Sequence, residues 1–181
     1  MTYVALLRGI NVGGKAKVEM TKLKITFEQL GCSNVFTYIN SGNVIFNADG
    51  ESVHELTGRI QQAIEADFGF VVPVVLRTQA QIQSICDQVP AGWVNDGQTM
   101  KTDVMFLWEK YDSPDALNYF KVKPGIEQLV YVGGALVWNI SREYITRGNV
   151  IEMIGTDIYK HLTIRNINTV RKLNVLMQAE Q

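Results

Sequence analysis

The residues best suited to chemistry in this sequence lie in two short polar loops. The segment "RGINVGGK", residues 8–15, follows an apolar run, and "NSGN", residues 40–43, separates two runs rich in β-branched and aromatic residues. Both loops offer side-chain and backbone hydrogen-bond donors, and neither contains a carboxylate. This donor set suits a phosphate, a small carboxylate or a nucleic-acid backbone. Its candidate ligand-binding residues are Arg8, Asn11, Gly13, Gly14, Lys15, Asn40, Ser41 and Asn43.

The first loop is not a nucleotide-binding P-loop. Gly9 and Gly14 have the P-loop spacing and Lys15 follows them, but Ala16 stands where a Ser or Thr would bind magnesium. The loop does not match the G-x-G-x-x-G pattern of dinucleotide-binding proteins either. A purely structural turn between a strand and a helix therefore explains it as well as a ligand-facing surface does.

A second polar set lies near the end of the chain in "RNINTVRKL", residues 165–173. These residues surround the expected start of a helix, where backbone amides bind anions readily. Helix capping and a solvated face explain the same residues without a ligand. The candidates here are Arg165, Asn166, Asn168 and Arg171.

Other chemistry is sparse. His54 and His161 have no cysteine or carboxylate neighbours at metal-ligand spacing, so no metal site is predicted. Cys32 and Cys86 are expected to be buried free thiols. No nucleophile elbow or Cys-x-x-Cys motif occurs. The sequence names no cofactor and leaves open whether the protein is an enzyme.

Composition limits the class of protein. The chain has 181 residues, 46% of them hydrophobic and 19% charged, which is ordinary for a globular protein. A net charge of −1 argues against a strongly basic nucleic-acid binder, although Arg8 and four lysines face only Glu19 within residues 8–24. The first residues do not resemble a signal peptide, and no segment is apolar over the length of a membrane helix. We therefore expect a cytoplasmic protein.

The first half of the chain predicts the element order βαββαβ. Strands are expected at 2–8 and 71–77, a hairpin at 34–47, and helices at 20–31 and 52–69. Thr21 is expected to cap the first helix, and Ser52 with Glu55 forms a capping box for the second. Pro73 cannot donate to a strand ladder, so the last strand should lie at a sheet edge. This order is that of a ferredoxin-like unit.

The second half of the chain repeats this order with shorter elements. After a linking helix at 78–89, the pattern predicts a strand at 103–108, a short helix at 113–120, a hairpin at 127–140, a helical stretch at 149–155, a strand at 162–165 and a final helix at 168–178 capped by Asn168.

We therefore predict an α+β fold with two ferredoxin-like βαββαβ units, a linking helix and a C-terminal helix. The expected domains are 1–77 and 101–181, joined by 78–100. "VLRTQAQI" is echoed by "TIRNINTV", which favours a topological duplication, although two unrelated segments could adopt the same order. In the first unit this topology brings the loops at 8–15 and 40–43, and the loop before the fourth strand, to one end of the sheet.

The segments "YVALLRGINVGGK", "TYINSGNVIF", "FGFVVPVVLRT" and "RNINTVRKL" resemble a bacterial family catalogued as domain of unknown function 1697. The resemblance covers nearly the whole chain and implies an α+β fold with ferredoxin-like parts. It implies no catalytic residues, because the family has no established activity. Members usually have a Lys-Leu-Thr-like stretch before the final motif. Here "TRGNVIEMIG" stands in that region, which puts a ligand role for a lysine there in doubt.

Three functions remain open at this stage. The first is the binding of a small anionic ligand, such as a phosphate, nucleotide or carboxylate, at the Gly/Asn-rich loops. The second is a protein-interaction or structural module in which the motifs serve only as turns. The third is nucleic-acid binding, which the net charge disfavours. Phe36, Tyr38 and Phe46 could form a base-stacking platform, but the RNA-recognition motif pattern is absent and core packing is favoured.

Overall fold

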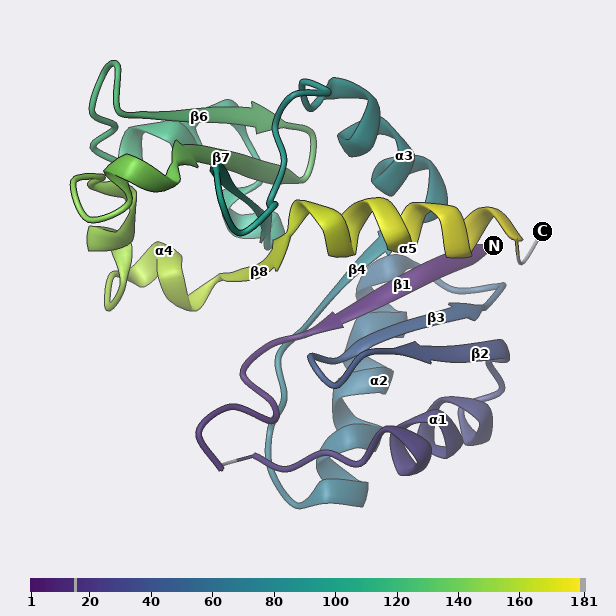
Figure 1. Ribbon diagram of the computed structural model, residues 1–181. Coiled ribbons are helices and arrows are strands. Elements are labelled where there is room, and N and C mark those ends of the chain that lie inside the picture. The colour runs from purple at the N-terminus through teal and green to yellow at the C-terminus, as the bar shows by residue number, and fades with distance from the viewer. Residues whose placement is uncertain (15, 180–181) are drawn as a thin grey trace. The chain divides into compact units, whose positions relative to one another are not determined.

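The computed structural model describes residues 1–14 and 16–179. They form two compact units, one of residues 1–79 with 175–179 and one of residues 80–174. Each unit contains its own four-stranded antiparallel sheet (Figure 1). The predicted α+β fold with two ferredoxin-like units is confirmed. None of the helices in the described ranges is both long and apolar enough to span a membrane.

The first unit has the predicted order of elements. Its sheet runs β2-β3-β1-β4, so β4 is an edge strand, as Pro73 predicted. The elements are β1 (Thr2–Leu7), α1 (Met20–Gln29), β2 (Ser33–Tyr38), β3 (Asn43–Asn47), α2 (Val53–Phe68) and β4 (Val74–Thr78).

The core of the first unit lies between one face of this sheet and the helices α1 and α2 (Figure 1). Tyr3, Ala5 and Leu7 alternate to this face of β1, as the two-residue period of a strand requires. The rings of Phe27 and Phe46 meet there edge to face, with 5.0 Å between their centroids. Neither ring is exposed to solvent.

The two helices of this unit begin differently. The capping box of α2 is confirmed, because the Ser52 hydroxyl accepts the Glu55 N–H and the Glu55 carboxylate accepts the Ser52 N–H. The prediction for α1 is wrong. Glu19, rather than Thr21, occupies the N-cap position, and the Glu19 side chain makes no capping hydrogen bond. The Glu19 carbonyl already accepts the Leu23 N–H, so Thr21 lies inside the first helical turn.

The second unit repeats the strand order as β6-β7-β5-β8. Short helices, mostly of the 3₁₀ type, replace the two long helices of the first unit, including the helices predicted at 113–120 and 149–155. The elements after β4 are α3 (Gln79–Gln88), β5 (Met100–Leu107), η1 (Glu109–Tyr111), η2 (Pro114–Tyr119), β6 (Glu127–Val132), β7 (Ala135–Ser141), η3 (Arg142–Tyr144), η4 (Val150–Met153), α4 (Asp157–Lys160), β8 (Leu162–Asn166) and α5 (Ile167–Ala179).

Backbone hydrogen bonds show that the two units correspond residue by residue at their first strands. The Leu7 N–H donates to Gly42 O at 2.8 Å, and the Leu107 N–H donates to Gly134 O at 3.0 Å. In the sheets, Val4 pairs with Arg77 and Val104 pairs with Arg165.

The start of α5 differs from the prediction. The Asn166 side chain accepts the Thr169 N–H at 2.9 Å and caps the helix. Asn168 lies inside the first turn and donates from its amide to Asn95 O at 2.7 Å. The predicted cap at Asn168 is therefore wrong, because β8 continues through Asn166 and turns directly into the helix.

Candidate functional site

The first loop and the hairpin turn meet at one end of the first sheet, as the topology predicted. The Asn11 amide nitrogen donates to Val18 O and to Asn40 O, each at 2.9 Å, and the Asn11 amide oxygen accepts the Val18 N–H at 2.8 Å. The Arg8 N–H donates to Pro73 O at 2.9 Å, which brings the start of β4 to the same end. The Asn11 side chain is therefore occupied in holding the loops together, rather than being available to a ligand.

Asn43 also has a structural role. It is fully buried, and its amide donates to Tyr38 O and to the Ser41 hydroxyl, each at 3.0 Å. These bonds close the turn between β2 and β3. Two of the predicted binding residues thus build the end of the sheet that carries the others.

The remaining predicted residues of the first loop differ in exposure. Gly13 and Gly14 are exposed and adopt left-handed backbone, with φ of 61° and 74°. Arg8 is half-buried. Lys15 lies outside the described residues. Gly14 with Asn40 helps to line an open recess at this end of the sheet.

This recess, which we call the loop recess, lies at the start of α1. Its empty volume is about 1100 Å³, including the space at its open mouth. The Lys17 ammonium and the Asn40 amide are exposed there and bond to no other described residue. The uncapped first turn of α1 contributes backbone amides and the positive end of the helix dipole. The described residues that line it are Asn11, Gly14, Lys17, Val18, Glu19, Met20, Thr21 and Asn40.

Sequence reasoning missed Lys17 as a part of this site. The signal for Lys17 was present in the excess of basic residues between 8 and 24. The predicted cap at Thr21 placed the start of this helix two residues later than the structure does, which has Glu19 at the N-cap. The recess also holds one unfavourable charge for an anion, the exposed Glu19 carboxylate.

Backbone strain is concentrated at this end of the sheet. Four non-glycine residues of the described chain have left-handed φ. Asn11 (55°) lies in the first loop, Ala16 (49°) directly follows that loop, and Ile39 (50°) directly precedes the hairpin turn. Left-handed backbone is uncommon for residues with a side chain and is an outlier for β-branched Ile39. Such strain gathers at functional sites, where surrounding contacts maintain it.

The second predicted set lies in the second unit and has mainly structural roles. The Arg165 side chain is buried and donates to Ile164 O at 2.9 Å, and burial lowers its pKa to about 10. Its counterpart in the first unit, Arg77, donates to Leu76 O at 2.8 Å in the same way. Asn166 caps α5 and Asn168 bonds to Asn95, which supports the capping interpretation. Arg171 is half-buried on α5.

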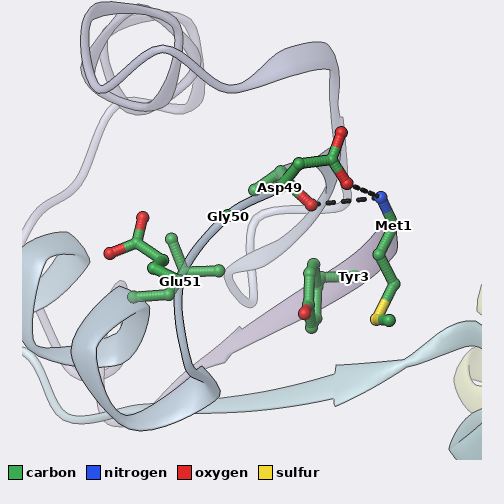
Figure 2. Close-up of a pocket in the computed structure, with 7 residues that line it drawn as sticks. Met1, Tyr3, Asp49, Gly50 and Glu51 are labelled. Carbon is green, nitrogen blue, oxygen red and sulfur yellow. Dashed lines mark hydrogen bonds and ion pairs between the residues drawn. The ribbon is translucent and has the colours of Figure 1, made fainter.

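A smaller recess at the opposite end of the first sheet has acidic walls (Figure 2). Asp49 and Glu51 lie beside it, and the Met1 amino group donates to Asp49 Oδ1 at 2.6 Å and to Ala48 O at 3.1 Å. Figure 2 shows the Met1 amino group turned toward the Asp49 carboxylate, with Tyr3 below them. The cations at this end are already paired, the Met1 amino group with Asp49 and Arg59 with Glu51, so the loop recess is the better anion site.

Metal and thiol chemistry find no support in the described ranges. No group of three or more His, Cys, Asp or Glu side chains within them could hold a metal ion. Cys32 and Cys86 are free, and burial raises the pKa of both thiols. Raised thiol pKa values disfavour the reactive thiolate form.

The fold defines an α+β protein of two ferredoxin-like units with a donor-rich recess in the first. The chain belongs to the family described as a protein of unknown function, DUF1697, whose family model matches residues 1–138. It is similar in structure to a conserved bacterial protein from Streptococcus pneumoniae, with 26% sequence identity, a TM-score of 0.82 and coverage of 98% of each chain. No curated protein matches it.

Proposed function

We propose that the protein binds a small anionic ligand of the phosphate type in the loop recess. The observation that carries this proposal is the uncapped start of α1, which opens into a recess beside the exposed Asn40 side chain and Lys17, whose ammonium bonds to no other described residue. Helix starts of this kind bind anions through backbone N–H groups and the helix dipole. The family has no established activity, so the proposal concerns binding and names no reaction.

The internal hydrogen bonds of the loops support a fixed site. Asn11 and Asn43 hold the first loop and the hairpin turn in one arrangement before any ligand arrives. Groups that are already in place lose less conformational entropy on binding. The left-handed backbone at Ala16 and Ile39 agrees with a surface maintained for function at the expense of local strain.

A titration of the full chain with inorganic pyrophosphate, followed by NMR, tests this proposal. We expect saturable shifts of the Gly14 and Thr21 amide signals. The Lys17→Met substitution should weaken binding about tenfold, because a charge-assisted hydrogen bond is lost. Glu19→Gln should strengthen binding by removing the one carboxylate of the recess lining.

Lys24→Met is the matched control. Lys24 is an exposed lysine of α1 that pairs with Glu28 at 3.7 Å and does not line the recess. Its substitution should leave pyrophosphate binding unchanged. Absence of saturable shifts in the unsubstituted chain would overturn the proposal and favour the view that these loops serve only as turns.

Nucleic-acid binding is less well supported by the structure. Phe46 is fully buried and packs against Tyr3 and Phe27, whereas Phe36 is 43% exposed. The three aromatic residues considered for base stacking therefore do not form one exposed platform. Binding of single-stranded RNA with a steep salt dependence would show otherwise.

A further inference from the structure

A charged pair lies on the core-facing side of β5 in the second unit. Lys101, Asp103 and Met105 share one face of the strand, and Met105 is part of the buried core. The Asp103 side chain is only 14% exposed and forms an ion pair with Lys101 at 3.2 Å. A carboxylate on the apolar face of a sheet is unusual, because removing its charge from water is unfavourable.

A recess opens beside this pair, between the sheet and the segments that cover it. The strand register places Asp103 opposite Trp138 and Met105 opposite Ile164, so these side chains adjoin on one face. The cover is apolar and is formed by Val150, Ile151, Met153, Ile154 and Tyr159. The recess has an empty volume of about 480 Å³, including the space at its open mouth.

At the polar end of this recess, which we call the β5 recess, the charged residues of the described lining are Lys101 and Asp103. The Lys101 ammonium lies over the Trp138 ring, 5.4 Å from its centroid. Burial raises the pKa of Asp103, and the nearby charges of Lys101 and Arg142 only partly offset this effect. Arg142 does not line the recess and donates to Asn95 Oδ1 at 3.1 Å, so Lys101 is the cation of the described lining. The Nε of Arg142 is also buried without a hydrogen-bond partner in the described chain.

The wall that Trp138 contributes is held rigidly. The Trp138 indole N–H donates to Glu127 Oε2 at 2.9 Å. The Glu127 carboxylate also accepts the backbone N–H groups of Lys123, Asn149 and Val150, so it is well satisfied where it lies. A fixed aromatic wall next to a cation suits a ligand with a flat apolar body and an anionic group.

We infer that the β5 recess binds a small carboxylic acid with an apolar body, the body against Trp138, Met105 and Ile164 and the carboxylate at Lys101. This site lies within the second unit and does not depend on the anion site proposed for the first. Asp103 can take up a proton when a second carboxylate approaches Lys101, since its burial already favours the neutral form.

A titration of the full chain with phenylacetate, followed by NMR, tests this inference. We expect saturable shifts of the Trp138 indole N–H signal and of the Met105 methyl signal. Phenylacetamide, a neutral ligand of the same shape, and phenethylamine, which carries the opposite charge, should each bind at least about tenfold more weakly. No saturable shift with phenylacetate, or equal binding of either analogue, would overturn the inference.

Two substitutions locate the site. Lys101→Met keeps most of the side-chain length and should weaken phenylacetate binding about tenfold, whereas Lys121→Met, at an exposed lysine outside the recess, should have no effect. A second variant keeps the test decisive if Lys101→Met impairs folding. Ile151→Glu alters a residue that is 52% exposed, so this variant should fold normally. It places a negative charge in the wall and should also weaken binding, by up to about fivefold. Unchanged affinity in Ile151→Glu would contradict the site.

Discussion

The two sheets share one strand order, but they fill the space beneath their covering layers differently. In the first unit Tyr3 pairs in register with Phe46, and their rings stack with centroids 5.8 Å apart. The corresponding pair in the second unit is Asp103 and Trp138. Two regular helices cover the aromatic pair, whereas short helical segments cover the second. A shared topology therefore fixes where strands lie without fixing whether the space above them is filled or left open as a recess.

The largest expected effect concerns the packed core of the first unit. Phe46→Ala should reduce the free energy of unfolding of the first unit by about 3–5 kcal/mol, because it leaves a cavity beneath Tyr3 and Phe27. Amide hydrogen exchange within β1 and β3 measures this loss. A change below about 1 kcal/mol would show that the rings do not form a tightly packed core.

The next largest effect concerns Glu127, whose buried carboxylate bonds to Trp138 in the wall of the β5 recess. Burial alone raises the pKa of Glu127, but the N–H donors from Asn149, Lys123, Trp138 and Val150 outweigh burial and hold the pKa below its usual range. Glu127 should therefore stabilise the second unit above the pKa it has when unfolded. That contribution should disappear as the pH falls through its lower folded pKa.

Glu127→Gln should remove this pH dependence and reduce the free energy of unfolding by about 2–3 kcal/mol, because an amide cannot accept all of these bonds. Denaturation at neutral and acidic pH measures both effects. An acid-induced loss of stability that is equal in the two proteins would assign the pH dependence to another group.

The helix starts give a smaller effect. Asn166→Ala should reduce the free energy of unfolding by about 1 kcal/mol, because the Thr169 N–H loses its partner. Ser52→Ala should have a similar effect on α2. Thermal unfolding of the two variants compares the caps of the two units. A larger loss in Asn168→Ala than in Asn166→Ala would contradict the assignment of the α5 cap.

The smallest effect concerns Asp103 itself. Its pKa is raised by burial, so the folded protein disfavours the charged form at neutral pH. Asp103→Asn should therefore change stability by less than about 1 kcal/mol, because the cost of burying the carboxylate offsets its attraction to Lys101. Urea denaturation at neutral pH measures it. A loss of several kcal/mol would mean that the pair stabilises the fold, rather than marking an open site.

Much of the fold could be predicted from local signals. The strands, the α2 capping box and the edge position of β4 follow from two-residue alternation, side-chain capping and the missing N–H of Pro73. The helix type at 113–120 and 149–155 could not be predicted, because short segments take their form from packing rather than from propensity. The cap of α5 was placed at Asn168 rather than Asn166, because both are good capping residues beside the start of the helical pattern.

The candidate site was predictable only in part. The βαββαβ order brought the first loop to the hairpin turn, as the Asn11 to Asn40 hydrogen bond shows. The path of the backbone decides which polar side chains form hydrogen bonds within the protein and which remain available to a ligand. The amides of Asn11 and Asn43 both donate to backbone carbonyls. Lys17 lies at the recess because α1 begins at Met20, two residues after Val18. The sequence did not show this boundary, because Thr21 is also a good capping residue.

The Asn11 amide has a further consequence for the loop that it closes. The Asn11 side chain bonds to both the carbonyl and the N–H of Val18, as a neighbouring strand would. The backbone N–H of Asn11 also donates to Ala16 O, so these bonds close the loop at its base. The exposed tip around Val12 and Gly13 is thereby mechanically separated from β1 and α1. This tip is a suitable place to insert a peptide tag or a fluorescent label, because its length can change while the sheet and the helix keep their register.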